Sequence, residues 1–243
     1  MNTFNQRGDF MYVVKLRNIF FIFLGIAVVT ISLNLLLNKS TKVETMASSY
    51  SDVIVVDAGH GLPDGGASNG DLYESDLNLK IAKKLEEELT NRGYDVIMTR
   101  ENENNIADAD KQSSLSSMKT SDLNNRVKII NESGADFCIS IHLNKFENPK
   151  YWGWQTFYNE KSEEGKELAR CIQENITEVI KKENTRTALK IDGIKIVDKT
   201  NIPVVIVECG FISNAEEAEL LQNDTYQSKL VEGICNGVEE FYH

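Results

Sequence analysis

Short runs of β-branched and other apolar residues alternate along this chain with longer segments of helical character. The runs are VIVVD (53–57), YDVIMT (94–99), FCISIH (137–142), WQTFY (154–158), GIKIV (193–197) and PVVIVE (203–208). Each has the length and the residue types of a buried strand. Their alternation with helical segments predicts a single α/β domain, with one mostly parallel sheet of about six strands and helices on both of its faces.

The segments between the runs carry helix signals. Apolar residues recur every three or four positions in three of them, marked by Leu77, Ile81, Leu85 and Leu89, by Val127 and Ile130, and by Leu168, Ile172, Ile176 and Val179. Gly93 and Gly134 follow the first two segments, as glycine commonly follows the last turn of a helix. Asn214 and Glu217 resemble a capping box that opens a fourth helix. The polar stretch Glu101–Asn125 predicts a long loop.

A long apolar segment precedes this domain. Residues 19–37 (IFFIFLGIAVVTISLNLLL) are numerous enough to cross a bilayer as a helix. Arg7, Lys15 and Arg17 lie before the segment, and positive charge is retained on the cytoplasmic side of a membrane. We therefore expect residues 1–18 to stay in the cytoplasm, residues 19–37 to form a transmembrane or signal-anchor helix, and the remainder to be exported and anchored outside the cytoplasmic membrane.

The remaining boundaries follow from composition. Residues 38–52 are polar and predict a linker, and residues 53–243 have the length of one folded domain. The sequence Thr45-Met46-Ala47 in the linker also fits a signal-peptidase cleavage site, although the apolar segment is long for a signal peptide. An uncleaved anchor is the interpretation we prefer.

Charge and cysteine content exclude some classes of protein. Residues 51–243 contain 21 Lys and Arg against 35 Asp and Glu, a net charge of −14. Such a surface repels nucleic acid and anionic lipid, so we expect no nucleic-acid partner. The four cysteines, Cys138, Cys171, Cys209 and Cys235, form no CxxC pair, and several have apolar neighbours. They predict buried free thiols rather than a disulfide framework.

Histidine is scarce in this chain, and its placement points to a site. His60 and His142 each follow directly on an apolar run, whereas His243 is the last residue. In an open α/β sheet, ligands gather beyond the carboxyl ends of the strands. Glu208 ends a third run, and Glu74 stands just before the first long helix, where a short Gly-rich loop allows it to fold back beside His60. These four residues are therefore expected to lie close together.

Two neutral imidazoles and one carboxylate form the ligand set of many catalytic zinc ions, which keep a fourth position for water. The pattern predicts His60, Glu74 and His142 as ligands of Zn²⁺, which makes hydroxide available near neutral pH. Glu208, at the end of an apolar strand, is the candidate general base and acid for amide hydrolysis. Each residue alone has an ordinary structural explanation, but the four together favour a zinc hydrolase.

At these residues the chain resembles the zinc-dependent N-acetylmuramoyl-L-alanine amidases of the Amidase_3 family. The matching segments are DAGHGLPDGGASNG, YESDLNLKIAKKL, VIMTRE, ISIHLN and IPVVIVECGFISNAEEAELL, from about residue 53 to the C-terminus. The ENTRTALK segment (183–190) is similar to that of the germination-specific, CwlD-type amidases of spore-forming bacteria. The resemblance implies that His60, Glu74 and His142 bind Zn²⁺ and that Glu208 is catalytic.

The resemblance also implies a substrate, which is the amide between the lactyl group of muramic acid and L-alanine in peptidoglycan. In the germination-specific subgroup this cleavage precedes formation of muramic δ-lactam in the spore cortex. Amidases of this family are often held inactive or need a protein partner, so an activating helper protein is a further hypothesis. The chain departs from the family at Cys209, where a small or hydroxylated residue is more common, and at Ala58, which replaces a proline.

Three other functions stay open. A zinc carboxypeptidase-like hydrolase of peptidoglycan peptides could use the same scaffold and site. A catalytically silent wall-binding protein would bind peptidoglycan without cleaving it. A cysteine hydrolase that pairs Cys209 or Cys138 with His142 would leave His60 without a role.

Five further residues have both a functional and a structural interpretation. Trp152 and Trp154 could stack on sugar rings or pack as core aromatics. Arg126 and Arg186 could pair with substrate carboxylates or form structural salt bridges. Asn144 could contact substrate or cap a turn.

Overall fold

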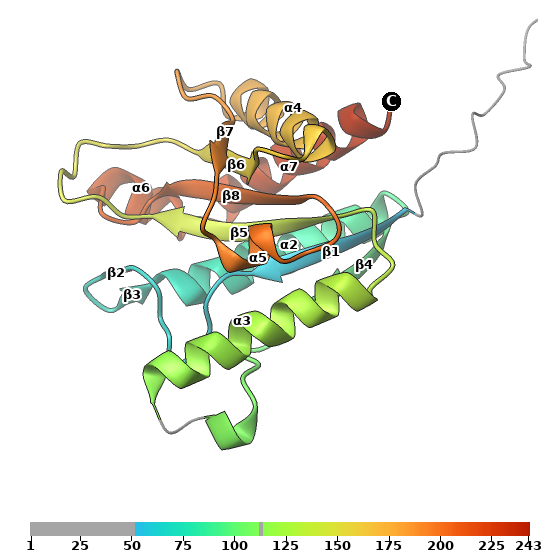
Figure 1. Ribbon diagram of the computed structural model, residues 1–243. Helices are drawn as coiled ribbons and strands as arrows, with labels where there is room; N and C mark the ends of the chain where they lie inside the picture. The colour runs from blue at the N-terminus through green and yellow to red at the C-terminus, as the bar shows by residue number, and fades with distance from the viewer. Residues whose placement is uncertain (1–51, 112–113) are drawn as a thin grey trace, which may run out of the picture. The chain divides into compact units, whose positions relative to one another are not determined.

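A computed structural model describes residues 52–111 and 114–243, in which helices flank a six-stranded sheet (Figure 1). In their order across the sheet, the strands are β4 (Asp95–Met98), β1 (Val53–Ala58), β5 (Phe137–Asn144), β8 (Val204–Phe211), β6 (Gln155–Asn159) and β7 (Leu189–Ile191). β4, β1, β5 and β8 are mutually parallel, whereas β6 runs antiparallel to β8 and β7 runs parallel to β6. The predicted mostly parallel sheet of six strands is confirmed.

One predicted strand is wrong. Residues 193–197 (GIKIV) do not form a strand, because Gly193 adopts a left-handed backbone conformation with φ 74° and Lys195–Asp198 form the short helix α5. The sixth strand is instead β7, immediately before this turn. Ile196 and Val197 are buried all the same, against the sheet, so their apolar character reflects a helix that covers the sheet rather than a strand within it.

Four long helices and several short elements complete the domain. They are α2 (Glu74–Asn91), α3 (Leu115–Glu132), α4 (Glu163–Ile180) and α7 (Asp224–Tyr242), with α5, α6 (Ala215–Leu220), the 3₁₀ helix η1 (Ala109–Lys111) and a hairpin of β2 (Ser68–Asn69) and β3 (Leu72–Tyr73). The Asn214 side chain caps α6 by accepting a hydrogen bond from the Glu217 amide at 3.1 Å. The Glu217 carboxylate accepts from the amides of Phe211 and Gly153.

The loop predicted at Glu101–Asn125 is shorter than expected, because α3 already begins at Leu115 behind an N-cap at Ser114. The first turns of α3 are mostly polar, with Leu115 and Met118 as their apolar residues, so the apolar pattern is clear only in the second half of the helix. Within residues 52–111 and 114–243, none of the helices combines the length and the apolar character that crossing a bilayer requires. The predicted membrane helix at residues 19–37 lies outside the described residues.

Alternate residues of each strand face opposite sides of the sheet, as the two-residue period of a strand requires. Ile54 and Val56 of β1 belong to a large core that includes buried residues of α2, α4 and α7. Val55 belongs to a smaller core with residues of α3 and α5, which lie on the other side of the sheet (Figure 1). The smaller core leaves room beside the sheet, and the even-numbered residues His142 and Glu208 face this side.

Candidate active site

The fold brings the four predicted residues together at the carboxyl ends of the parallel strands. His60 follows β1, His142 lies near the end of β5, and Glu208 lies near the end of β8. His142 and Glu208 are directly opposite each other in the β5–β8 register, so their side chains share one face of the sheet. Glu74 is the first residue of α2, and its carboxylate contacts both histidines. The register of β5 and β8 shifts just beyond these residues, a position where bulges often accompany active sites.

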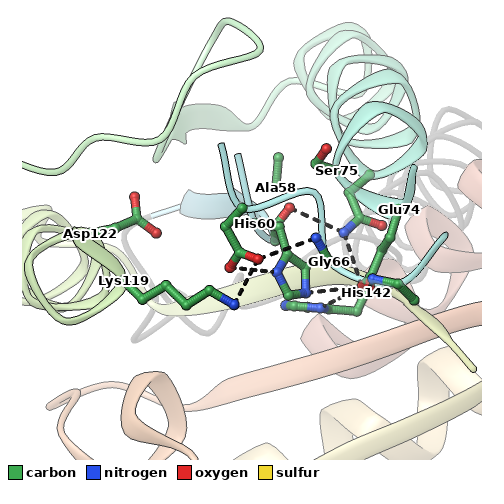
Figure 2. Close-up of polar contacts among 12 residues, drawn as sticks. Ala58, His60, Gly66, Glu74, Ser75, Lys119, Asp122 and His142 are labelled. Carbon is green, nitrogen blue, oxygen red and sulfur yellow. Dashed lines mark hydrogen bonds and ion pairs between the residues drawn. The ribbon is translucent and has the colours of Figure 1, made fainter. Parts of the chain in front are cut away.

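Three of the four side chains form a potential metal-binding group. One nitrogen of His60, one oxygen of Glu74 and one nitrogen of His142 all lie within 4.8 Å of one another. Figure 2 shows the two imidazoles and the carboxylate converging, with Oε1 of Glu74 3.3 Å from Nε2 of His60 and 3.0 Å from Nδ1 of His142. A set of two imidazoles and a carboxylate matches the donors that a catalytic zinc ion prefers. The residues therefore fit a zinc ion chemically and in their mutual distances.

Glu74 is held in place by backbone donors as well as by the histidines. The Leu143 amide donates to Oε1 at 3.1 Å, and the Ala67 amide donates to Oε2 at 2.8 Å. Burial raises the pKa of Glu74, but its contacts with His142 and His60 outweigh burial and hold the pKa well below its usual range. Glu74 is therefore an anion at any physiological pH, as a metal ligand must be.

His60 is oriented by a second carboxylate. Oδ2 of Asp64 lies 3.1 Å from Nδ1 of His60, and Oδ1 of Asp64 lies 2.8 Å from the Lys119 ammonium. When Nδ1 of His60 donates its proton to Asp64, the lone pair of Nε2 is free to bind a metal ion that Glu74 also binds. Burial lowers the pKa of His60, but Glu74 and Asp64 outweigh burial and raise it.

Two glycines leave the space that this arrangement needs. A Cβ at Gly59 would lie 2.3 Å from the ring of His142. Gly66 adopts a left-handed conformation with φ 68°, and a Cβ there would lie 2.6 Å from Oε2 of Glu74 and 2.8 Å from the ring of His60. These contacts explain the glycine-rich character of the loop between β1 and α2.

Two buried arginines fix the backbone from which His60 projects. Arg126, which is 1% exposed, donates to the carbonyl groups of Ala58 and His60. Arg100, which is 2% exposed, donates to the carbonyl groups of Ala58 at 2.8 Å and Gly59 at 3.0 Å. Burial lowers the pKa of Arg100 to about 10, so it stays cationic near neutral pH. His60 itself has φ 60°, an uncommon conformation that these contacts stabilise.

A buried carboxylate lies beneath this loop. Asp57 accepts hydrogen bonds from Thr99 at 2.6 Å, Ser140 at 2.6 Å and Arg126 at 2.7 Å. Burial raises the pKa of Asp57, but Arg126, Ser140 and Thr99 outweigh burial and lower the pKa to about 2. Arg126 is also paired with Asp122 at 2.8 Å, so all five of its N–H groups have protein partners. The salt-bridge interpretation of Arg126 is the one the contacts support.

Glu208 differs from Glu74 in its environment. Burial, together with the nearby Glu74, raises the pKa of Glu208 to about 7 against the opposing effect of His142 and His60. Its Oε2 atom is buried, and no described residue donates a hydrogen bond to it. Buried carboxylate oxygens are normally hydrogen-bonded, so an unpartnered one in a cleft suits a group that exchanges protons with a bound reactant.

His60, His142 and Glu208 border a cleft of about 530 Å³. His60, Asp64, Lys119 and Asn144 line its polar part, while the side formed by β6, β7 and α5 is apolar and includes Phe157. His142 and Glu208 lie between the two parts, on β5 and β8. The cleft can therefore accept a ligand with both apolar and polar groups next to the His–Glu–His cluster.

The remaining candidate residues have structural contacts. Trp154 is fully buried, so it cannot stack on a sugar ring. Lys182 lies 4.2 Å above the Trp152 ring, and Trp152 packs edge-on against Trp154. The Arg186 guanidinium donates to Gln155 and lies 4.9 Å from the Phe211 ring centroid.

The cysteines do not support nucleophilic catalysis. All four are free and buried, as predicted. Burial raises the pKa of Cys138 well above its usual value and also raises that of Cys209, so neither thiol is readily ionised. Cys209 belongs to the large core on the far side of the sheet from Glu208.

Several residues of the site were not singled out from the sequence. Asp57, Asp64, Arg100 and Lys119 each act through the three-dimensional arrangement rather than through a distinctive local pattern. Asp64 carried one signal, its position four residues after His60 in a glycine-rich loop. Arg100 directly follows a strand-forming run.

Comparison with known sequences adds a family context to this geometry. Residues 54–240 match the model of the N-acetylmuramoyl-L-alanine amidase family. Over 190 residues, the chain is 38% identical to the germination-specific N-acetylmuramoyl-L-alanine amidase of Bacillus subtilis, which covers 78% of this chain and 79% of that protein.

Solved structures show the same similarity. The CwlD amidase of Clostridioides difficile, solved in complex with the GerS lipoprotein, matches with a TM-score of 0.76 and 40% identity, over 78% of this chain and 97% of that one. An N-acetylmuramoyl-L-alanine amidase of Clostridium difficile 630 matches with a TM-score of 0.68 and 31% identity, over 80% of this chain and 97% of that one.

Proposed function

Because this chain belongs to the N-acetylmuramoyl-L-alanine amidase family, we propose that it is a zinc-dependent enzyme that hydrolyses the amide between the lactyl group of muramic acid and L-alanine in peptidoglycan. The observation that carries the proposal is the convergence of His60, Glu74 and His142 within 4.8 Å, with Glu208 paired to His142 across the β5–β8 register. Family membership supports the substrate class, and this arrangement supports the zinc-dependent chemistry.

Each residue has a distinct role in the proposed reaction. His60, Glu74 and His142 would hold Zn²⁺, which would polarise an amide carbonyl and lower the pKa of water when bound. Glu208 accepts a proton from the attacking water and donates it to the departing alanine nitrogen. A pKa raised by burial suits this exchange, since such a carboxyl group can both take up and release a proton near neutral pH, and a nearby dication favours its ionised form.

The biological setting is a finer part of the proposal. Identity of 38% to a germination-specific amidase supports a role in the peptidoglycan of the spore cortex, where the cleavage would precede formation of muramic δ-lactam. The apolar residues 19–37 support anchoring in the cytoplasmic membrane with the catalytic domain outside. In that location peptidoglycan is within reach of the cleft.

A helper protein is a further part of the proposal. The similar CwlD amidase was solved with a lipoprotein bound, which supports the idea that this chain also has a protein partner. We propose that such a partner stabilises the zinc site. Full zinc occupancy and full activity of the purified chain alone would contradict this part of the proposal.

Product analysis tests the function directly. Purified full-length protein is incubated with intact peptidoglycan and zinc, and the products are identified by mass spectrometry. Amidase activity releases whole stem peptides that begin with L-alanine. A carboxypeptidase-like hydrolase would release single amino acids, and a silent wall-binding protein would release nothing while remaining bound to the wall. Either of these last results overturns the proposal.

A further inference from the structure

Lys119 brings a positive charge to the cleft that the proposed reaction does not use. It lies on α3, and its side chain reaches toward His60 (Figure 2). Its ammonium lies 2.8 Å from Oδ1 of Asp64. The Lys119 side chain is 44% exposed, whereas that of Asp64 is 18% exposed. An ion pair of this exposure contributes little to stability, so a structural role alone explains Lys119 poorly.

Lys119 is the cation of the cleft that can accept a further partner. Two cations line the described part of the cleft, and the other, Arg126, is buried with all five of its donors engaged. Lys119 has one ion-pair partner among residues 52–111 and 114–243, which is Asp64. Because an ammonium carries three N–H donors, Lys119 has donors left to bind an anionic group of a ligand.

The distribution of apolar and charged residues around the cleft indicates which end of a ligand carries that anionic group. The side formed by β6, β7 and α5 is apolar and includes Phe157, Ile191, Ile194 and Ile206. Lys119 lies on the other side, next to the loop that carries His60. Asp64 and Asp122 also line that side, but they are already paired with Lys119 and Arg126. A ligand that fills the cleft can therefore place apolar groups on one side and an anionic group at the remaining donors of the Lys119 ammonium on the other.

We propose that Lys119 determines specificity by binding the α-carboxylate of the second stem-peptide residue. This inference rests on the proposed function. In peptidoglycan, L-alanine is followed by a γ-linked D-glutamate whose α-carboxyl group is either free or amidated. An extended residue spans about 3.5 Å, so this group lies roughly 7 to 8 Å beyond the scissile amide. The Lys119 ammonium lies 2.8 Å from Oδ1 of Asp64, and Nδ1 of His60 lies 3.1 Å from Oδ2, so a single carboxylate separates the ammonium from a proposed metal ligand, and a ligand of this span can bridge that separation.

The test uses two soluble muramyl tripeptides that differ only in whether this α-carboxyl group is free or amidated. Full-length protein with zinc is expected to cleave the free acid with a kcat/KM about tenfold higher, the size of one charge-assisted hydrogen bond at a partly exposed site. Lys119→Met is expected to reduce this ratio to about one, mainly through KM on the free acid. Lys119→Arg is expected to retain the preference, and so is Lys128→Met, which removes an exposed lysine of α3 that does not line the cleft.

Several results would overturn the inference. Equal cleavage of both substrates by the unaltered protein removes the basis for specificity while leaving the amidase function intact. An equal loss on both substrates in Lys119→Met, together with weaker zinc binding, shows that Lys119 acts only through Asp64 and His60. If the unaltered protein cleaves neither tripeptide nor intact peptidoglycan, the proposed function itself fails.

Discussion

Asp57 and Arg126 form a buried ion pair whose role is to build the site rather than to contact substrate. The two residues are each 1% exposed, their side chains lie 2.7 Å apart, and Arg126 also donates to the carbonyl group of His60. Burying two charges is costly unless the remaining donors and acceptors are satisfied. Here Thr99 and Ser140 complete the shell of Asp57, so the charges are well compensated.

Arg126→Met tests this role. The substitution leaves the Asp57 carboxylate buried without its cation, and we expect the free energy of unfolding to fall by about 3 kcal/mol. Arg170→Met is the matched control, because Arg170 also contacts several carboxylates but its side chain is 40% exposed, and we expect a loss below about 1 kcal/mol. Chemical denaturation followed by fluorescence of the buried Trp154 measures both values. Similar losses in the two variants would contradict the account.

At the scale of elements, the loop from β1 to the β2–β3 hairpin is shaped to hold two of the proposed metal ligands. His60 is the second residue of this loop, Glu74 follows the hairpin directly, and Gly66 lies between them in a left-handed conformation. The absence of a side chain at Gly66 lets the His60 ring and the Glu74 carboxylate approach each other. The geometry of the proposed metal site therefore depends on the backbone conformation of this loop at Gly66.

Gly66→Ala and Gly70→Ala separate these two effects. Both glycines have a positive φ, so both variants carry the cost of a left-handed alanine, about 1 to 2 kcal/mol. Only at Gly66 does the added Cβ meet Glu74 and His60, since nothing lies within 4 Å of one at Gly70. We expect zinc affinity, measured by competition with a chelator, to fall at least about tenfold in Gly66→Ala alone. An equal fall in both variants would point to backbone strain as the cause.

At the scale of the whole molecule, the buried carboxylate of Asp57 makes the stability of the fold depend on pH in acid. The pKa of Asp57 is lowered from 3.8 to about 2 in the folded protein. A lowered pKa stabilises the fold fully above the unfolded value, and this contribution is lost as pH falls through the folded value. We expect the contribution of Asp57, on the order of 2 kcal/mol, to disappear between about pH 4 and pH 2.

Urea denaturation at a series of pH values measures this loss. Asp57→Asn cannot titrate, so its stability should be lower than that of the unaltered protein at neutral pH and should decline less steeply below pH 4. Asp224→Asn is a suitable control, because the Asp224 side chain is 85% exposed at the start of α7. Parallel curves for Asp57→Asn and the unaltered protein would show that Asp57 does not contribute as described.

Much of the fold was predictable because most of its elements are buried and strongly patterned. The apolar runs at β1, β5 and β8 are too short to be interpreted as helices. The apolar residues of α2 and α4 recur at helical spacing and face the core. The sequence pattern places a strand at residues 193–197, where α5 lies, and none at β7. A three-residue edge strand leaves almost no signal, and a buried helical turn has the apolar character of a strand. The polar start of α3 was missed because it packs little apolar surface.

The four central residues of the site were predictable from the sequence, whereas the residues that support them were not. His60, Glu74, His142 and Glu208 could be grouped because strand ends of a parallel sheet meet at one edge. Arg100, Arg126 and Asp64 act through contacts with backbone carbonyl groups or with another side chain, and such contacts depend on the tertiary arrangement. Arg126 illustrates the limit, because a substrate contact and a salt bridge require the same residue type.

Glu208→Gln provides the most direct test of the central claim that three residues hold zinc and Glu208 transfers the proton. Full-length protein and variant are stripped with a chelator and reloaded with zinc, and bound metal and release of stem peptides are measured on the same samples. We predict one zinc per chain in both, with release falling at least about 100-fold in the variant. Loss of zinc binding in Glu208→Gln, or peptide release by the unaltered protein without zinc, would contradict the account.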